Sequence, residues 1–571
     1  MTSVRTGAQA FADVLEQEGV TCVFGLPGTQ TVGLYEALRH SSVRSIVPTH
    51  ELGAAFMAYG FARASGRVGV VLTIPGPGFA FTPAGLAEAL LDGVPIVLFT
   101  LGPSRGPAGE LGFQALDQVA IARPLVKAVF RVEKRADLPG IVREALHIAR
   151  QPDAGPVFVE MTDDALRAMG ESSTDSTFPA PGQVQPALET AASLGAFIDR
   201  IAQAKRPAIF VAGDFAGSGA RLARVASEGR VPVFVPAPSR GVLPEDHPWA
   251  LCCDDQRTPC KDVTSALSNA DLVVVLGTRL THIATSGFKL ALTAERVACV
   301  SESGEELPHG YQASVTVHSS VDAVLARLES ETGHFASTWS ETDAGELKPQ
   351  FAGAMPTEPP EPVVNGGDAA TFFAELRSVL PRDAIVVTDS GLHQALVRRH
   401  FPVLGAGGLL FPSELQSMGF GLPVAMGAKI ARPDRVVVVV MGDGGFAISG
   451  LELLTAARDG IQVIVVVFND GKLNLIRLQQ LREYGVTYGT DLHELDLERF
   501  AQAVGVDYRH AGDGSVRALT EALGSRRATI VEVVVGDSNR IRLRTARSYA
   551  KASVRRTVGP GITNWLKRWL R

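Results

Sequence analysis

Short, continuous apolar runs alternate with stretches of helical periodicity along most of the chain. An apolar run of this length is typical of a strand that is buried on both faces of a parallel sheet. Regular alternation of such strands with helices predicts an α/β fold in which helices cover both faces of each sheet. The predicted strands are 22–25, 68–73, 95–101, 208–212, 231–235, 272–276, 384–388, 436–440, 463–468 and 530–535, and residues 83–92 predict a helix with a proline in its first turn.

Two stretches that lack this pattern divide the chain into three units. Residues 171–187 are rich in Ser, Thr, Pro and Gly, which is typical of a linker, and residues 331–363 are weakly patterned and contain prolines. The length of 571 residues also suits about three domains, at roughly 100–200 residues each. We therefore expect three doubly wound parallel-sheet domains, at 1–170, 188–330 and 364–540, followed by a basic tail at 541–571.

Composition narrows the functional class. The chain is 20% charged and 46% hydrophobic, which argues against disorder, and a formal net charge of −6 gives no sign of nucleic-acid binding. Five scattered cysteines without a CxxC pair predict neither a disulfide framework nor a zinc site. The apolar runs are too short to cross a bilayer and the N-terminus lacks a signal-peptide core, so we expect a cytoplasmic protein.

The tail differs in charge from the rest of the chain. Residues 540–571 hold ten Lys and Arg and no Asp or Glu, so a tail of +10 on a chain of −6 leaves −16 elsewhere. Two tryptophans, Trp565 and Trp569, lie on one apolar stripe of a helical pattern beside basic residues, which suits peripheral contact with the inner membrane face. Docking of this amphipathic helix on the enzyme or on a partner subunit explains the same pattern. The basic run 540–547 also suits a lid whose Arg side chains bind a carboxylate.

The residues with the clearest chemistry lie at strand ends in the third unit. One predicted strand runs into Gly442, Asp443, Gly444 and Gly445, and the next ends beside Asp470. The carboxyl ends of parallel strands lie at one edge of the sheet, so Asp443 and Asp470 can meet at one cation. Glycines there let backbone N–H groups approach phosphate oxygens, and Mg²⁺ prefers hard oxygen ligands together with phosphates. The sequence therefore predicts a site for Mg²⁺ and a diphosphate.

This segment resembles the GDG…NN signature of thiamine diphosphate (ThDP)-dependent enzymes of the acetolactate synthase/pyruvate oxidase type. The resemblance implies that Mg²⁺ is bound by the side chains of Asp443 and Asp470 and by the backbone carbonyl of Lys472. The family usually has Asn in the place of Asp470 and commonly Gly in the place of Asn474, so this chain departs from the pattern twice. The cofactor contacts implied for this unit are Ser390, Gly391, His393, Gln416, Met418, Gly442, Gly444, Gly445, Leu473 and Ile476.

Two further segments of this unit carry the resemblance. Residues 412–428, PSELQSMGFGLPVAMGA, resemble the family segment beneath the cofactor. There Met418 would bend the cofactor, and the carbonyl of Gln416 would accept a hydrogen bond from the aminopyrimidine. Residues 389–393 resemble the first diphosphate loop and include His393. Without the surrounding motifs, a Met near glycines such as Met418 is more often a core residue, and an ordinary surface position is the alternative for His393.

The first unit resembles the part of the family that binds the pyrimidine. Residues 49–55 resemble the HExxA motif, in which Glu51 would hydrogen-bond the pyrimidine N1′ and so help to activate the thiazolium carbon. Taken alone, Glu51 is also an ordinary acidic residue at a helix start. A GLPG turn, an IPGPG turn and the segment 112–114 resemble further family segments, although Phe81 stands where the family often has Asn. The implied catalytic residues are Glu51, Gln114, Gly28 and Thr29, and Gly78 would contact the cofactor.

The resemblance covers about residues 5–540 and implies the activity. We expect ThDP- and Mg²⁺-dependent decarboxylation of a 2-oxo acid, with carboligation of the resulting enamine to a second carbonyl compound. Family active sites lie between the first domain of one subunit and the third of another, so a homodimer or homotetramer is implied. Three alternatives stay open: a flavin-dependent, membrane-associated pyruvate oxidase-like enzyme, a simple 2-oxo acid decarboxylase, and a catalytically idle binding or regulatory subunit.

Several positions bear on these alternatives. Gln479 stands where acetolactate synthases carry a Trp, and the chain has no His-His pair of the kind common in dedicated decarboxylases. Residues 277–279, GTR, resemble part of the pattern beside a bound flavin. Residues 299–303, CVSES, lack the acidic pair that FAD binders of the family often show, and there is no GxGxxG motif. FAD is therefore kept as the less favoured cofactor.

Overall fold

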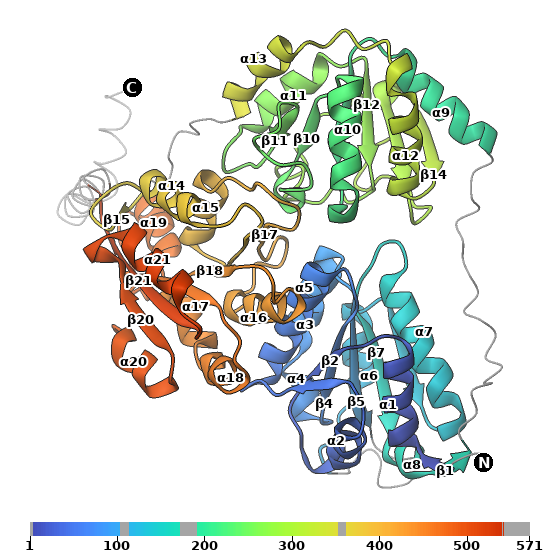
Figure 1. The fold of residues 1–571 in the computed structure, drawn as a ribbon, viewed down its shortest axis with the longest axis vertical. Helices are drawn as coiled ribbons and strands as arrows, with labels where there is room; N and C mark the ends of the chain where they lie inside the picture. Colours follow the sequence, from blue (N-terminus) through green and yellow to red (C-terminus); the bar gives the residue numbers. More distant parts are fainter. Residues whose placement is uncertain (1–3, 103–112, 172–190, 352–360, 539–540, 542–571) are drawn as a thin grey trace, which may run out of the picture.

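The computed structural model describes residues 4–102, 113–171, 191–351, 361–538 and 541. These residues form three α/β units, drawn in blue to cyan, in green and in orange to red in Figure 1. Apart from Glu171 and Ile541, the expected linker at 171–187 and tail at 541–571 lie outside the described residues. Each predicted strand is present, with ends within two residues of the prediction, and the helix predicted at 83–92 is α5 (Pro83–Asp92). The mostly parallel, doubly wound α/β architecture predicted from the sequence is confirmed.

The first unit is built on a parallel sheet that helices cover on both faces. Successive strand residues enter opposite cores: Val97 packs in the core that contains α1 and α7, and Leu98 in the core that contains α3. The strands, in sheet order, are β3 (Arg44–Ile46), β2 (Cys22–Phe24), β4 (Gly69–Thr73), β5 (Ile96–Gly102), β7 (Val157–Thr162) and β6 (Ala128–Val132). The helices are α1 (Gly7–Gln17), α2 (Val32–Arg39), α3 (Glu51–Ser65), α4 (Pro77–Ala80), α5, α6 (Gln118–Ala122), α7 (Leu138–Arg150) and α8 (Asp163–Arg167), and β1 (Val4–Thr6) pairs with β8 (Met169–Glu171).

The central unit, at the top of Figure 1, has its own parallel sheet and core. The strands, in sheet order, are β11 (Ala250–Cys252), β10 (Val233–Val235), β9 (Pro207–Val211), β12 (Leu272–Leu276), β13 (Val297–Ser301) and β14 (Val315–His318). The helices are α9 (Ala191–Gln203), α10 (Gly219–Gly229), α11 (Cys260–Ser268), α12 (Val321–Glu331) and α13 (Glu341–Phe351). Helix α13 lies within the stretch expected to be weakly patterned. Trp339 anchors it, because its indole is buried in the central core and donates to the Pro207 carbonyl at 2.9 Å.

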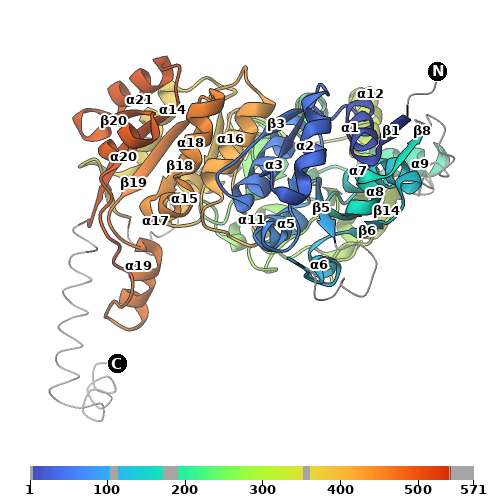
Figure 2. The ribbon, with the colours of Figure 1, turned by 90° about the horizontal axis from the view of Figure 1, so that it is seen from below.

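The third unit carries the predicted metal site at the carboxyl ends of its strands. The strands, in sheet order, are β15 (Val363–Val364), β21 (Thr529–Gly536), β19 (Ile464–Asn469), β18 (Val437–Gly442), β16 (Ile385–Thr388) and β17 (Leu409–Leu410), with β20 (Asp507–His510) also beside β21, and β15 alone among the described strands of this sheet is antiparallel. The helices are α14 (Ala369–Val379), α15 (Leu392–His400), α16 (Gly421–Ala431), α17 (Asp443–Ser449), α18 (Glu452–Asp459), α19 (Asn474–Glu483), α20 (Leu497–Val504) and α21 (Ser515–Gly524). Figure 2 shows α19 standing away from the body of this unit.

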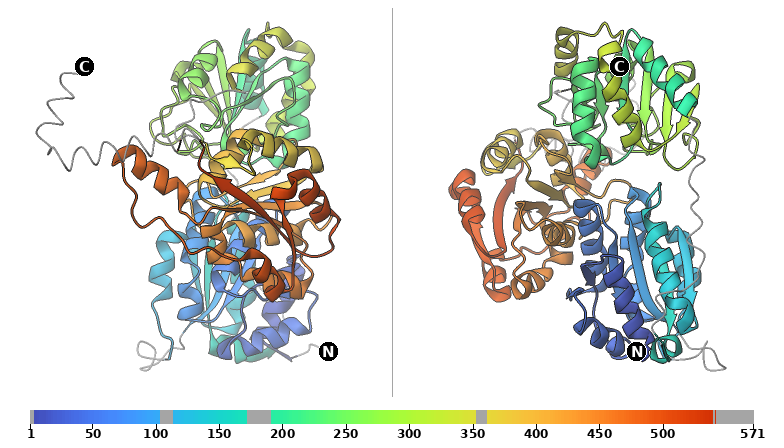
Figure 3. Two further views of the ribbon diagram at one scale, coloured as in Figure 1. Left: turned by 90° about the vertical axis from the view of Figure 1, so that its left-hand side faces the viewer. Right: turned by 45° about the vertical axis from the view of Figure 1, so that its right-hand side comes forward.

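Helices α3 and α16 join the first unit to the third. They lie side by side in Figure 1, and their buried residues belong to one continuous core. A Cβ added at Gly60 would overlap the Val424 carbonyl, and one added at Gly427 would overlap the Met57 carbonyl, so the two backbones touch. Figure 3 shows the central unit lying over the other two.

The described helices include none that combines the length and the apolar composition needed to cross a membrane. All five cysteines are free thiols.

Candidate active site

The carboxyl ends of β18 and β19 bring together the two acidic residues predicted to bind a metal. The two strands pair in parallel register, so their tips lie side by side. Asp443 opens α17, and its carboxylate accepts hydrogen bonds from the backbone N–H groups of Gly444 at 2.7 Å, Asp470 at 3.2 Å and Gly471 at 2.6 Å. The carboxylate of Asp443 therefore spans the two strand tips.

Asp470 faces Asp443 from the tip of β19. Its Oδ1 accepts the Lys472 backbone N–H at 3.0 Å, and its Oδ2 accepts the side-chain amide of Asn474 at 2.6 Å. Burial, together with the negative charge of Asp443, raises the pKa of Asp470 to about 6. A divalent cation between the two carboxylates would offset this repulsion.

A cavity of about 130 Å³ opens at these strand tips, and third-unit residues alone line it in the part of the chain that the structure describes. Every third-unit residue predicted to contact the cofactor or the metal lines it, with the exception of Gln416. These residues are Ser390, Gly391, His393, Met418, Gly442, Asp443, Gly444, Gly445, Asp470, Lys472, Leu473 and Ile476. The sequence motifs therefore converge on one place.

Gly444 and Gly445 line this cavity, and a side chain at either position would crowd its walls. A Cβ at Gly445 would lie 3.0 Å from the Asp389 carboxylate, and one at Gly444 would lie 3.0 Å from Leu473. Asp443, Asp470 and Lys472 all line the cavity, and two carboxylates with a backbone carbonyl are hard oxygen donors of the kind that Mg²⁺ accepts beside a phosphate. The residues present therefore fit Mg²⁺ and a diphosphate.

Asp389, which the sequence predicted only as part of a loop, organises the floor of the site. Its buried carboxylate accepts the backbone N–H groups of Ser390 at 2.8 Å, Gly419 at 3.1 Å and Gly421 at 2.8 Å. Burial raises the pKa of Asp389 to about 6. This carboxylate ties the predicted diphosphate loop to the segment that carries Met418.

His393 is buried rather than exposed at the surface. Burial lowers the pKa of His393 to about 4, so the ring is neutral at pH 7. Its Nε2 lies 2.9 Å from the carbonyl oxygen of Asp389, which can only accept, so Nε2 carries the hydrogen. Its Nδ1 is then a lone-pair nitrogen, and the ring offers the cavity an acceptor.

Two glutamines predicted to face the cofactor, Gln114 and Gln416, have left-handed backbones. Their φ angles are +59° and +62°, which residues other than glycine seldom adopt outside constrained sites. The side chain of Gln416 donates to the carbonyls of Pro412 at 2.7 Å and Ser413 at 2.8 Å, which fixes the turn. Met418, two residues on, keeps 38% of its surface exposed and reaches the cavity.

In the first unit, Glu51 opens helix α3. His50 caps this helix, because its Nδ1 accepts the Leu52 N–H at 3.1 Å, and its ring packs on Phe81 with centroids 4.6 Å apart. The Glu51 carboxylate lies against the turn after β4, where a Cβ at Gly78 would be 3.3 Å from its Oε1. Phe81 stands where the family often has Asn, and here its ring packs on His50, the residue directly before Glu51.

The other predicted residues of the first unit surround the same turn. A Cβ at Gly28 would lie 2.5 Å from the side chain of Ile74, so the turn that leads to Thr29 packs on it. Gln30 donates to Gln114 Oε1 at 2.5 Å. The sequence motifs therefore gather Glu51, Gly28, Thr29, Gly78 and Gln114 at one edge of the first sheet.

The two groups of residues do not form one pocket within a single chain. The 130 Å³ cavity contains no first-unit residue, and no hydrogen bond or ion pair links Glu51 to the third unit among the described residues. The predicted site residues thus form two groups within one chain, which we call half-sites: the diphosphate half at the strand tips of the third unit and the Glu51 half in the first unit.

Sequence reasoning missed two buried carboxylates beside these half-sites. Glu452 of α18 accepts the Thr49 backbone N–H at 3.0 Å, and Glu88 of α5 accepts the Ser417 N–H at 3.2 Å. Each has one carboxylate oxygen that is buried without a hydrogen-bond partner. Their partners lie more than 300 residues away in sequence, so no local pattern could have found them.

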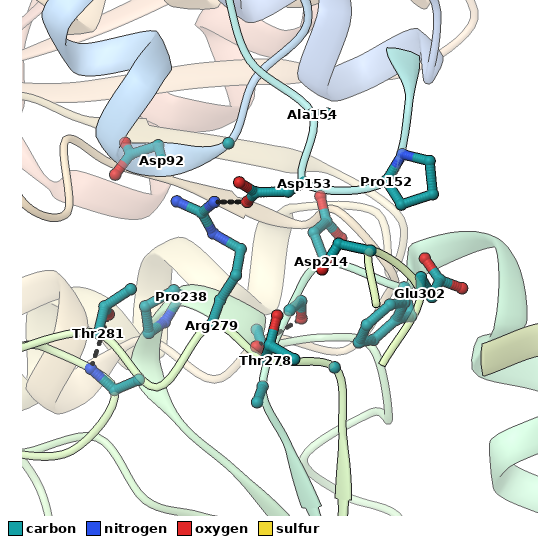
Figure 4. A pocket seen from close by; sticks show the side chains of 18 of the residues that line it. Asp92, Pro152, Asp153, Ala154, Asp214, Pro238, Thr278, Arg279, Thr281 and Glu302 are labelled. Atoms are coloured by element: carbon teal, nitrogen blue, oxygen red, sulfur yellow. Dashed lines mark hydrogen bonds and ion pairs between the residues drawn. The ribbon is translucent and has the colours of Figure 1, made fainter. Parts of the chain in front are cut away.

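A second cavity, of about 250 Å³, lies between the first and central units at the GTR segment (Figure 4). Arg279 crosses it, with Nη1 2.9 Å from Asp153 Oδ1 and Nη2 donating to the Leu91 carbonyl. Asp92, Asp214 and Glu302 also line it, together with Arg63 and Arg150. The residues that line this cavity give no support for FAD as a second cofactor.

Comparisons with known proteins identify the family of the chain. Three family models match the chain: the N-terminal TPP binding domain of thiamine pyrophosphate enzymes at residues 5–121, the central domain at 194–328 and the C-terminal TPP binding domain at 389–533. The acetolactate synthase isozyme 1 large subunit of Escherichia coli is 29% identical over 520 residues, which is 88% of each chain. An acetolactate synthase of Mycobacterium bovis is 30% identical over 512 residues, covering 88% of this chain and 82% of that protein.

A solved structure shows the same fold. The thiamine diphosphate-dependent 4-hydroxybenzoylformate decarboxylase of Rhodococcus jostii RHA1 superposes with a TM-score of 0.78, at 24% identity, over 94% of this chain and 100% of that one. None of the matched family descriptions names a flavin. The chain therefore belongs to the thiamine diphosphate-dependent enzyme family, in its acetolactate synthase/pyruvate oxidase-like group.

Proposed function

We propose that this enzyme decarboxylates a 2-oxo acid and joins the remaining acyl fragment to a second carbonyl compound, using ThDP and Mg²⁺. One C–C bond breaks with loss of CO₂ and one C–C bond forms, so the products are CO₂ and a 2-hydroxy ketone, with no external oxidant. The observation that carries the proposal is the convergence of twelve motif residues on the cavity at the tips of β18 and β19. The acetolactate synthases among the relatives support carboligation as the outcome.

The third unit would hold the charged end of the cofactor. Asp443, Asp470 and the Lys472 carbonyl would bind Mg²⁺, and the backbone N–H groups of Gly444 and Gly445 would meet the diphosphate. When bound, ThDP would supply a nucleophilic thiazolium carbon for the 2-oxo carbonyl and a sink for the electrons that remain when CO₂ leaves. Met418 would support the cofactor from below. On the apolar side of the cavity, Leu473 and Ile476 would contact it, and water would be excluded there.

The first unit would supply the proton chemistry. Glu51 would hold a proton at the pyrimidine N1′, in general acid–base fashion. Gln114, beside Gln30, would orient the substrate oxygen, and the turn of Gly28 and Thr29 would close over the reacting carbon. The left-handed backbone of Gln416 would present its carbonyl to the aminopyrimidine.

We infer that two chains form the complete site. Each half-site carries exposed apolar side chains: Phe81 and Phe113 beside the Glu51 half, and Ile448, Leu451 and Leu454 beside the diphosphate half. Exposed apolar groups gathered on one face are typical of an interface. Pairing the first unit of one chain with the third unit of another would cover both faces and complete two active sites in a homodimer, which could pair again into a homotetramer.

Some assignments extend beyond the site. The domain limits 1–170, 188–330 and 364–540 remain our proposed division, and the packing of Trp339 supports extending the central domain past 330. We further propose a cytoplasmic enzyme whose basic tail, outside the described residues, contacts an anionic membrane surface. Cosedimentation of the full chain with anionic and neutral vesicles tests this, and equal binding to both would argue against it.

CO₂ release and product identity test the proposed function. Purified protein is given pyruvate, with ThDP and Mg²⁺ added or withheld, alone and with a second carbonyl compound. We expect cofactor-dependent CO₂ and a 2-hydroxy ketone. An aldehyde alone would identify a simple decarboxylase, and visible flavin absorbance of the purified protein would restore the oxidase alternative.

Glu51→Gln provides the decisive variant. General acid–base catalysis contributes about 10²–10⁴-fold, so turnover should fall by about that factor. ThDP binding, followed by calorimetry, should persist because the diphosphate half-site is intact. Unchanged turnover in this variant would refute the mechanism, and an absence of ThDP binding to the unaltered protein would indicate an idle scaffold.

A further inference from the structure

We propose that Asn474 is the positioning residue for the metal ligand Asp470, and that these two residues work as a matched pair. The inference rests on the proposed Mg²⁺–ThDP site. Two of the positions at which the third unit departs from the usual family pattern are in direct contact, because Asn474 Nδ2 donates to Asp470 Oδ2 at 2.6 Å. The chain has a carboxylate, Asp470, where the family usually has Asn, and a hydrogen-bond donor, Asn474, where the family commonly has Gly. The donor binds the carboxylate.

The donors around Asp470 require a carboxylate at this position. Its Oδ1 accepts the Lys472 N–H at 3.0 Å, and its Oδ2 accepts the Asn474 amide. Both side-chain atoms therefore face donors, and each oxygen retains a lone pair for a cation. An Asn at position 470 has only one acceptor atom, so its NH₂ group would be directed at one of these two donors. A carboxylate avoids this conflict.

A hydrogen bond from Arg477 fixes the orientation of the Asn474 side chain. Arg477 Nε donates to Asn474 Oδ1 at 2.9 Å, so the amide oxygen faces Arg477 and the NH₂ group faces Asp470. Arg477 is paired with Asp537, with Nη1 3.2 Å from Oδ2 and Nη2 bonded to Oδ1. Asn474 and Arg477 are 8% and 7% exposed, so water competes little for these bonds.

This relay connects two strands through one helix. Asp537 directly follows β21, Arg477 and Asn474 lie on α19, and Asp470 directly follows β19, the parallel neighbour of β21. The Asp537–Arg477 pair ties the first turn of α19 to the end of β21, and Asn474 in that turn holds the carboxylate of Asp470. The relay therefore assigns a function to the first turn of α19: it presents Asp470 to the cation beside Asp443.

A double-mutant cycle tests the pairing. Asp470→Asn, Asn474→Ala and the double variant are compared with the unaltered full-length enzyme. ThDP is titrated calorimetrically at fixed Mg²⁺, and Mg²⁺ is titrated at fixed ThDP. A charge-assisted hydrogen bond contributes about 1.5–3 kcal/mol, which corresponds to roughly tenfold or more in affinity.

We expect each single variant to weaken Mg²⁺-supported ThDP binding by about tenfold or more. The double variant should lose less affinity than the product of the two single losses. The reason is that, without the Asn474 amide, no donor faces the NH₂ group of an Asn at position 470. Asn474→Asp, which puts a second carboxylate against Asp470, should be weaker than Asn474→Ala. Glu483→Gln, an exposed substitution on the same helix, is the matched control and should bind like the unaltered enzyme.

Losses that multiply independently, or an Asn474→Asp variant that binds normally, would overturn the pairing. Thermal melting of each cofactor-free variant identifies a folding defect, and Asn474→Asp keeps the side-chain size if Asn474→Ala fails to fold. If the unaltered enzyme binds no ThDP with Mg²⁺, the proposed function fails and the inference falls with it. If the unaltered enzyme binds ThDP, but the losses of the two single variants simply multiply in the double variant, the proposed function stands and only the pairing is refuted.

Discussion

The carboxylate of Glu452 accepts the backbone N–H of Thr49 at 3.0 Å, so the third unit holds the turn that precedes Glu51. Thr455 and Arg458, on the same face of α18, donate to the Val47 carbonyl at 3.4 and 2.6 Å. Helix α18 thereby fixes the start of α3. Because α18 follows the helix that Asp443 opens, one continuous segment serves both half-sites of the chain.

Glu452→Ala should lower turnover. The variant leaves a buried N–H without an acceptor, which costs about 1–3 kcal/mol, and a loss of that size in transition-state stabilisation corresponds to about fivefold to 160-fold in kcat. The KM for the 2-oxo acid should change little, because Glu452 does not line the cavity. Glu452→Gln keeps an acceptor oxygen and should restore most of the activity. Equal losses in the two variants, or a change confined to KM, would argue against a positioning role.

The stability of the enzyme should depend on pH through Glu88. Burial, together with the charge of Asp92, raises the pKa of Glu88 to about 7 from its ordinary value of 4.5. A carboxyl whose pKa is raised by folding stabilises the protein when protonated. This contribution is complete below about pH 4.5 and is lost as the pH rises through about 7, for a total of about 3 kcal/mol.

Glu88→Gln removes this dependence. The variant should gain stability relative to the unaltered protein at pH 8 and should lose that advantage at pH 5. Urea unfolding followed across this range measures the difference, with the exposed Glu346→Gln as the control. A constant difference between the two proteins at every pH would show that Glu88 is not the titrating group.

Much of this fold could be predicted because its strands are buried on both faces, which makes each one a continuous apolar run. The site could be placed for a related reason: Asp443 and Asp470 each follow such a run, and parallel strands end at one edge of the sheet. Helix α13 could not be predicted from local pattern, because its attachment to the central unit depends on Trp339, which donates a hydrogen bond to Pro207, more than 100 residues earlier. The contact between Asp470 and Asn474 could not be predicted either, because sequence spacing does not give the orientation of the Asn474 side-chain amide.

The contact between α3 and α16 should tolerate no added side chain. Gly60→Ala or Gly427→Ala would place a methyl group on the facing helix backbone, so the helices must separate. Overpacking of this kind costs about 1–3 kcal/mol or more, and here the cost falls on the core that joins the first and third units. Gly33→Ala on α2, where nothing lies within 4 Å of the added Cβ, is the matched control and should be neutral or stabilising by about 0.5–1 kcal/mol. Urea unfolding midpoints measure both effects, and equal midpoints for all three variants would contradict the close packing.

Mg²⁺ and ThDP should stabilise the enzyme only together. A ligand that binds only the folded protein, at 100 times its Kd, contributes about 2.7 kcal/mol, so the thermal midpoint should rise with both present and fall back when the metal is chelated. Asp443→Asn should abolish this rise. Its side chain has one acceptor atom in place of two, whereas Asp443 accepts N–H groups through both of its oxygens and would also bind the cation. Asp434→Asn, at an exposed carboxylate of the same unit, should keep the full rise. An Asp443→Asn variant that is still stabilised by Mg²⁺ and ThDP would remove Asp443 from the metal site and leave Asp470 without its partner there.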